Sequence, residues 1–138
     1  MISKDELLAL TGKRFDAVGR GDVKGALAVL VDDPIFDLYP AGLRLRGREN
    51  VRRHYEHYFK HVAPAIVGAE QIATYFADDA IGFEFTMSWR AENGAVQASR
   101  MLVVTPVEGD KFTGERVYTD ERLIRWMFAG GTLEPIEA

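Results

Sequence analysis

The sequence contains no cysteine, which excludes disulfide bonds and any metal site built on thiolates. It also has no apolar run approaching the ~18 residues of a membrane-spanning helix. Positive charge is not in excess: 17 basic against 21 acidic residues give a formal charge of −4, which argues against a nucleic-acid-binding surface. The first residues, MISKDELLAL, do not join a basic start to an apolar block. We therefore expect no secretion signal and a cytoplasmic location.

The composition is that of an ordinary globular protein. Of 138 residues, 47% are hydrophobic and 28% are charged, and there is no low-complexity run. This length is enough for a real core, so we expect a single domain over residues 1–138. A local basic cluster is interpreted as a solvated loop and helix start, not as a phosphate site; it comprises Arg44, Arg46, Arg48, Arg52 and Arg53.

Three helices are predicted in the first half of the chain. Ser3 and Glu6 form a capping box for the first, and Asp22 can cap a second, shorter one over 23–31. The apolar stripe of the first helix is predicted to comprise Leu7, Leu8, Thr11, Phe15 and Val18. A third helix begins near Arg48 and ends before Pro64. Its buried stripe is predicted to comprise Val51, Tyr55, Tyr58, Phe59 and Val62.

The remaining chain alternates in the manner of strands. A short early strand, PIFDLYP, places Phe36 and Leu38 on one face and Asp37 and Tyr39 on the other. Further strands are predicted over 65–77, 80–89, 95–107 and 111–119, followed by a short helix capped by Asp120. This order predicts an α+β fold: a strongly curved, cone-shaped antiparallel sheet with the N-terminal helices packed on its concave face. Such a cone leaves a natural pocket for a small ligand.

The register of the central hairpin has two alternatives. A two-residue loop at Asn93-Gly94 would place Glu84 on the face of Met101 and Val103. A three-residue loop with a glycine bulge would place Phe83, Phe85, Met87 and Trp89 on that face and Glu84 near Arg100 outside. The second gives the cleaner apolar interior and is favoured.

Three segments together resemble the nuclear transport factor 2-like superfamily, in its SnoaL-like and ketosteroid-isomerase-like branch. They are GDVKGALAVLVDD running into PIFDLYP, then LRGRENVRRHY, then EGDKFTGERVYTD. The resemblance covers nearly the whole chain and implies a mostly dimeric, cytoplasmic group. That group includes isomerases, polyketide cyclases, dehydratases, an epoxide hydrolase and non-catalytic binding domains, so it says little about the reaction.

Functional positions of these relatives are not all retained. The helix-one tyrosine of the ketosteroid isomerases corresponds to Phe15, and their aspartate base to Leu38, one residue past Asp37. Their second acid falls near Met101 or Val103. The Asp-Arg-Asp set of the limonene epoxide hydrolases falls on Thr86, Glu84 and Val117. Steroid isomerisation by the known mechanism is therefore not expected.

The candidate catalytic residues are Asp37, Tyr39 and Glu115. If Asp37 and Tyr39 face the cone, desolvation raises the pKa of the acid and makes it a usable general base or acid. The alternative has Asp37 in solvent and Tyr39 in the core. Glu115 either lines the cone as a second acid or forms a salt bridge with Arg100 or Arg116.

The expected ligand-contacting residues are Phe15, Tyr55, Tyr58, Phe85, Trp89, Met101 and Val117. Tyr55, Tyr58 and Trp89 are alternatively core residues. His57 and His61 have a spacing that suits zinc, but His54, His57 and His61 cannot all reach one ion from one helix face. We interpret the three as a solvated or interfacial flank and expect no metal.

The leading hypothesis is a cofactor-free isomerase, cyclase or hydrolase acting on an apolar, oxygen-bearing molecule such as a polyketide or terpenoid. In it Asp37 moves a proton, Tyr39 donates a hydrogen bond and Glu115 assists. The alternatives are a non-catalytic binding domain and a dimeric interaction module whose cone is filled by side chains such as Phe85 and Trp89. A homodimer through the outer sheet face is expected.

Overall fold

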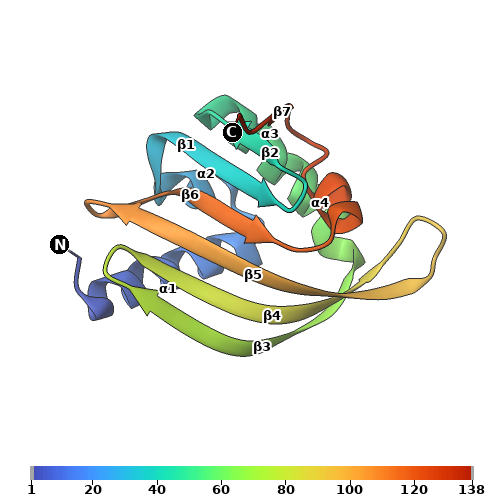
Figure 1. Cartoon of the computed structure of the whole chain (residues 1–138), viewed down its shortest axis with the longest axis horizontal. Coiled ribbons are helices and arrows are strands. Elements are labelled where there is room, and N and C mark those ends of the chain that lie inside the picture. Colours follow the sequence, from blue (N-terminus) through green and yellow to red (C-terminus); the bar gives the residue numbers. More distant parts are fainter. Residues whose placement is uncertain (1, 138) are drawn as a thin grey trace.

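A curved seven-stranded sheet and four α-helices make up the computed structural model, which describes residues 2–137 (Figure 1). The sheet order is β3-β4-β5-β6-β1-β2-β7. The strands are β1 (Leu30–Tyr39), β2 (Leu43–Arg46), β3 (Ile66–Ala77), β4 (Ala80–Arg90), β5 (Val96–Glu108), β6 (Lys111–Tyr118) and β7 (Leu133–Pro135). The predicted α+β fold is confirmed. The sheet is mixed, however, because β1 pairs with β6 in parallel while the other pairings are antiparallel.

The helices lie on one side of this sheet (Figure 1). They are α1 (Lys4–Gly19), α2 (Val23–Ala28), α3 (Arg48–His57) and α4 (Glu121–Met127). The capping box of α1 is present: Ser3 accepts a hydrogen bond from the Glu6 amide, and the Glu6 carboxylate accepts one from the Ser3 amide. Beyond α3 the chain continues through a π-helical turn (Tyr58–Val62) and a 3₁₀ turn (Ala63–Ala65), so helical structure runs to just past the predicted end before Pro64.

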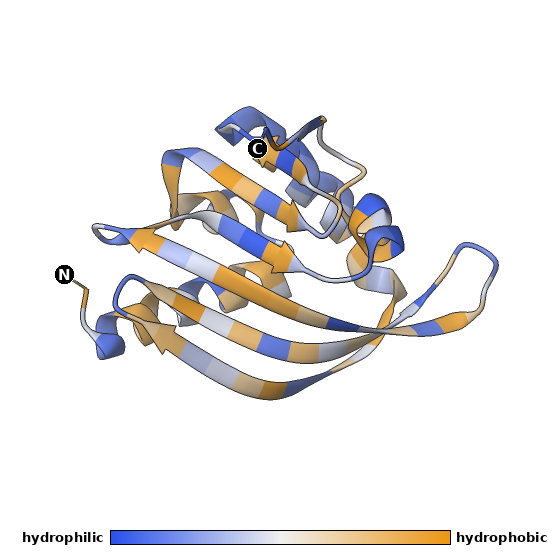
Figure 2. Cartoon of the chain, in the orientation of Figure 1, coloured by the Kyte–Doolittle hydropathy of each residue, from blue (hydrophilic) through white to orange (hydrophobic). Residues whose placement is uncertain are grey.

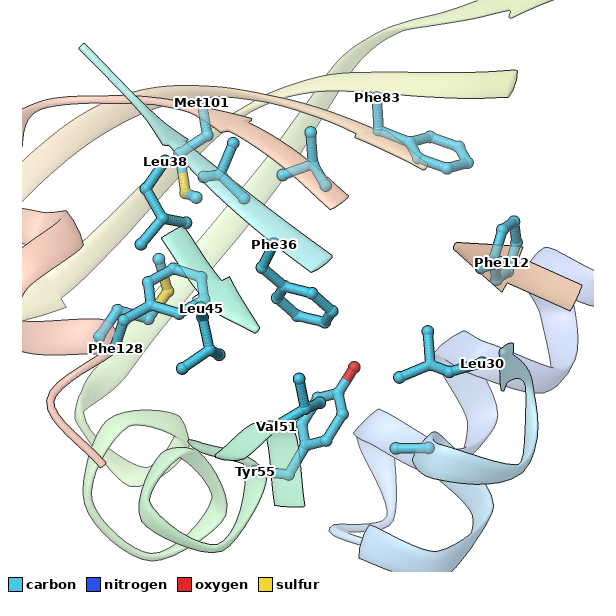
Figure 3. Packing of buried hydrophobic residues seen from close by; sticks show 14 of the residues in the cluster. Leu30, Phe36, Leu38, Leu45, Val51, Tyr55, Phe83, Met101, Phe112 and Phe128 are labelled. Carbon is cyan, nitrogen blue, oxygen red and sulfur yellow. The ribbon is translucent and has the colours of Figure 1, made fainter. Parts of the chain in front are cut away.

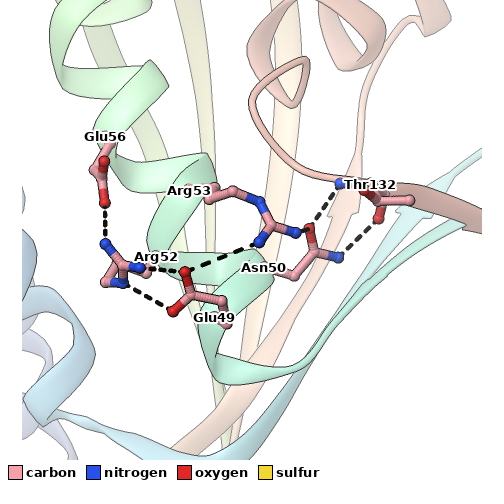
Figure 4. A network of polar contacts seen from close by, with 6 residues as sticks. All are labelled: Glu49, Asn50, Arg52, Arg53, Glu56 and Thr132. Carbon is pink, nitrogen blue, oxygen red and sulfur yellow. Dashed lines mark hydrogen bonds and ion pairs between the residues drawn. The ribbon is translucent and has the colours of Figure 1, made fainter.

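The segment interpreted as an arginine-rich loop contains a strand. Residues Leu43–Arg46 form β2, which pairs with β1 and with the unpredicted β7. The helical part of the arginine cluster lies on the solvent side of α3, where Arg52 bonds Glu49 and Glu56 (Figure 4). Arg52 and Arg53 pair with neighbouring acids, whereas Arg48 donates to the backbone carbonyls of Leu27 and Val31. The cluster therefore does not form a free basic surface.

The favoured hairpin register is the one observed. Phe83 pairs with Val103 and Phe85 with Met101, and the Ala91 amide donates to the Ala95 carbonyl across a three-residue loop. Gly94 has φ +84°, a left-handed conformation that favours glycine. The apolar face of β4 and β5 is therefore turned toward the helices.

The core lies between this inner face and the helices. Phe36 and Leu38 of β1 are fully buried there, as are Leu45 of β2 and Val51 of α3 (Figure 3). Hydrophobic and hydrophilic segments alternate along the strands (Figure 2), as expected of a sheet with one buried face. Within residues 2–137, none of the helices has the length and apolarity needed to cross a membrane.

Candidate ligand-binding cavity

The inner face of the sheet and the helices enclose a cavity of about 380 Å³. Its size lies within the range of small-molecule sites, at the lower end. The lining is mostly apolar and aromatic, and it comes from α1, α3 with its π-helical turn, β3, β4, β5, β6 and the end of α4. The alternative of a cone filled by side chains is therefore wrong, because a cavity of this size remains.

A buried ion pair lies on the wall of this cavity. The Arg14 guanidinium of α1 donates a hydrogen bond from Nη2 to Oε1 of Glu115 on β6. The two side chains are only 12% and 8% exposed. Burying one of these charges alone would cost several kcal/mol, so each ion stabilises the other in this position. The predicted partners of Glu115, Arg100 or Arg116, are wrong.

Arg14 was not identified from the sequence. The predicted stripe of α1 runs through Leu8 and Phe15, but these are exposed, and the buried positions are Leu7, Leu10, Thr11 and Ala17. Arg14 lies three and four residues after Thr11 and Leu10, in the middle of this buried stripe. A stripe shifted by one residue would have shown a charge on the core face of the helix.

Glu115 reaches the interior because β6 is irregular. Its inward residues Phe112, Glu115 and Val117 are spaced by three and then by two, and the pairing of β5 with β6 shifts register between Val104 and Val107. Gly114 has φ +142°, and a Cβ there would overlap the backbone of Ile35. A glycine is therefore required where β6 approaches β1 just before the acid.

The electrostatic environment separates the titrating groups of the cavity. Burial raises the pKa of Glu115, and the Arg14 charge partly opposes this. Burial also raises the pKa of the Tyr55 hydroxyl. Burial, with the His57 and Arg14 charges, lowers the pKa of His54 to about 3. At neutral pH His54 and Tyr55 are therefore uncharged.

Three buried polar atoms in this region have no hydrogen-bond partner among residues 2–137. They are Arg14 Nε, His54 Nδ1 and the Tyr55 hydroxyl oxygen. The Tyr55 hydroxyl points away from α3 into the interior (Figure 3). Buried polar groups are normally paired, so these atoms leave unused hydrogen-bonding capacity at the cavity wall. Tyr55 and Arg14 interact with each other there, but without a hydrogen bond of good geometry.

Six of the seven predicted ligand-contacting residues line the cavity: Phe15, Tyr55, Tyr58, Phe85, Met101 and Val117. Phe15 is 46% exposed and its ring lies 5.1 Å from that of Phe83, at the rim of the cavity. Trp89 does not line it. Its ring stacks on Trp126 and its Nε1 donates to Ser99, so it belongs to the core beyond the cavity.

Asp37 and Tyr39 are not brought to the cavity, and their predicted inward orientation is wrong. Phe36 and Leu38 occupy the inner face of β1, so the period of two turns Asp37 and Tyr39 outward. Asp37 accepts two hydrogen bonds from Arg44 across the β1–β2 pair, at 2.6 and 2.9 Å. Tyr39 stacks on Tyr118 with ring centroids 5.2 Å apart.

The histidines do not share one environment. His54, predicted on a solvated flank, is buried and stacks on Phe128 at 4.3 Å. The rings of His57 and His61 lie 5.1 Å apart, and His61 is exposed. In the part of the chain that the structure covers, residues 2–137, no three histidine or acidic side chains gather into a metal-binding group.

Several solved structures have an architecture similar to that of this chain. A nuclear transport factor 2-like protein from Burkholderia xenovorans has a TM-score of 0.68 at 19% identity, covering 96% of this chain and 100% of that one. A putative isomerase from Bacillus subtilis also has a TM-score of 0.68, at 17% identity, covering 97% of this chain and 100% of that one. No family model matches the sequence, and a search of curated proteins finds no match.

A third similar structure, from Mycobacterium tuberculosis, is a complex with estradiol-17beta-hemisuccinate. Its TM-score is 0.65 at 19% identity, and the match covers 85% of this chain and 95% of that one. The cone-shaped sheet, the helix order and these matches show that the chain has the fold of the nuclear transport factor 2-like superfamily, as the sequence motifs predict.

Proposed function

We propose that this protein binds an apolar, oxygen-bearing small molecule in the cavity and transfers a proton on it with Glu115. The observation that carries the proposal is a buried carboxylate on the wall of a mostly apolar cavity. A carboxylate in such a place is a stronger base than one in water, because desolvation disfavours its charged form. Glu115 thus takes the role that the sequence suggested for Asp37.

The ion pair leaves Glu115 able to accept a proton. Arg14 occupies Oε1, and no hydrogen bond from residues 2–137 reaches Oε2. A C–H bond beside a carbonyl group, placed against Oε2, would lose its proton to the carboxylate. The same carboxyl would return it to another carbon, so no cofactor is needed. This sequence of steps describes an isomerase, one of the classes that the sequence suggested.

The test is exchange of carbon-bound protons for deuterium in an apolar cyclic ketone, followed by ¹H NMR in D₂O. Wild type is expected to accelerate exchange, and Glu115→Gln to abolish the acceleration, because an amide cannot accept the proton. Glu84→Gln is the matched control, since Glu84 also pairs with an arginine but lies on the outer face. Equal exchange by wild type and Glu115→Gln would reject the assignment.

A second candidate is a non-catalytic binding protein with the same cavity. It is favoured by the Arg14 charge, which partly opposes the rise in the pKa of Glu115 and so weakens it as a base. Binding of the ketone by both wild type and Glu115→Gln, with exchange at the uncatalysed rate, would establish this function in place of catalysis.

A homodimer through the outer face of the sheet is part of the proposal. That face carries exposed Tyr75 and Tyr118 and half-buried Leu102 and Val104. An apolar patch of this kind on a sheet is typical of an interface. Light scattering during size-exclusion chromatography should give twice 15.5 kDa for wild type and a lower mass for Leu102→Glu. A wild-type monomer would contradict it.

A further inference from the structure

The charges on the cavity wall balance without a ligand. Arg14 contributes one positive charge and Glu115 one negative charge, and the two are in direct contact. The other polar groups of the lining are Gln71 and the uncharged Tyr55, Tyr58 and His54. A charged ligand would therefore bring an unbalanced charge into a poorly solvated space, at a cost of several kcal/mol.

The unpaired atoms of the cavity wall determine which polar group of a ligand can bind there. Arg14 Nε carries a hydrogen and can only donate. The Tyr55 hydroxyl interacts with Arg14, which can only donate, so the hydroxyl hydrogen remains available for another acceptor. An ether, epoxide or carbonyl oxygen can accept from such donors. An ammonium group cannot accept a hydrogen bond at all, and the paired Arg14 and Glu115 leave no net negative charge to balance it.

We infer that the cavity selects uncharged apolar molecules carrying a hydrogen-bond acceptor oxygen, and that Arg14 and Tyr55 are its specificity-determining residues. The inference rests on the proposed function, because it names the ligand class of the same cavity. It adds that the ion pair discriminates between neutral and charged ligands, because Glu115 cancels the charge by which Arg14 would otherwise attract carboxylates.

Three probes of nearly equal shape test the inference by isothermal titration calorimetry at neutral pH. They are 2-acetylnaphthalene, which is neutral, 2-naphthoate, which is an anion, and 2-naphthyltrimethylammonium, which is a cation. Wild type is expected to bind the ketone about tenfold or more tightly than either ion, from the uncompensated charge. Tighter binding of either ion would overturn the inference while leaving the proposed binding function intact.

Two variants assign the effect to residues. Glu115→Gln leaves Arg14 as the single charge of the pair, so the order is expected to invert and 2-naphthoate to bind more tightly than the ketone. Tyr55→Phe keeps the charges and removes a donor, so ketone affinity is expected to fall about fivefold with the ion preference unchanged. Glu84→Gln is expected to behave as wild type, because its carboxylate lies outside the cavity.

The outcomes separate the two claims. If none of the three probes binds wild type, both the proposed function and the inference fail. If the ketone binds best but Glu115→Gln retains that order, the pair does not set the preference and the inference is overturned. If Glu115→Gln does not fold, the inference is still tested by the order of probe affinities in wild type and by the loss of ketone affinity in Tyr55→Phe.

Discussion

Two glutamate–arginine pairs lie on opposite faces of the same sheet and differ in almost every physical respect. Glu115 pairs with Arg14 inside the cavity, where the side chains are 8% and 12% exposed. Glu84 pairs with Arg100 on the outer face, where they are 23% and 63% exposed. Burial raises the pKa of Glu115, whereas hydrogen bonds from Tyr75 and then Arg100 lower the pKa of Glu84.

The difference shows that an ion pair does not by itself define the reactivity of its carboxylate. Outside, water solvates both charges and the pair adds little to stability. Inside, the charges depend on each other, and desolvation raises the pKa of the acid while the Arg14 charge partly opposes this. Only the inner pair combines a basic carboxylate with space for a ligand.

The largest expected effect comes from removing each arginine. Arg14→Met leaves the Glu115 carboxylate buried without its partner, and is expected to lower the free energy of unfolding by about 3 kcal/mol. Arg100→Met, with both partners solvated, is expected to cost less than about 1 kcal/mol. Urea unfolding at neutral pH measures both. Equal losses would mean that water reaches the inner pair as freely as the outer one.

The buried histidine His54 extends the comparison of buried and exposed groups to the pH dependence of stability. His54 is buried with a pKa of about 3, against an ordinary value of 6.5. Between these values the unfolded chain binds the proton and the folded one does not, so stability falls as pH decreases. In this pH range the contribution of His54 to the unfolding free energy is expected to change by about 1.4 kcal/mol per pH unit.

The measurement compares wild type with His54→Gln in urea between about pH 6.5 and pH 4.5. Because Gln does not titrate, the difference in unfolding free energy isolates the His54 contribution. His61→Gln is the control, because it makes the same substitution at an exposed histidine. A slope unchanged in His54→Gln would show that the imidazole is protonated in the folded state.

Much of the fold could be predicted because it follows from local patterns. The capping box of Ser3 and the glycine-containing loop at Asn93-Gly94 each act through residues close in sequence, and alternation identified the inner face of β4. The β1 strand was also predicted, with Asp37 and Tyr39 on the face opposite Phe36. What alternation could not supply was which of the two faces is inside.

The site was harder to predict because its central contact is non-local. Arg14 and Glu115 are 101 positions apart, and neither carries a periodic signal that points to the other. Apolar periodicity treats a charge as a surface residue, so a paired charge within a core stripe is missed. Aromatic wall residues such as Tyr55 and Phe85 were found because they follow the same periodicity as the core.

The smallest expected effect is in the pH dependence of the unfolding free energy, to which the two glutamates contribute with opposite signs. Between the ordinary value of 4.5 and the raised pKa of Glu115, the folded protein holds a proton that the unfolded chain has lost. The unfolding free energy therefore falls as pH rises through this window. For Glu84, whose folded pKa is below 4.5, the stabilisation is present above 4.5 and is lost as pH falls through the lowered value.

Urea unfolding of wild type, Glu115→Gln and Glu84→Gln from about pH 4 to about pH 8 resolves the two signs. Subtracting each variant from wild type removes the titrations that they share, including that of His54. With increasing pH above 4.5, the unfolding free energy of wild type should fall relative to that of Glu115→Gln. Relative to that of Glu84→Gln, it should stay constant in the same range. If both stay level, the Arg14 charge outweighs desolvation, and Glu115 is too weak a base for the proposed proton transfer.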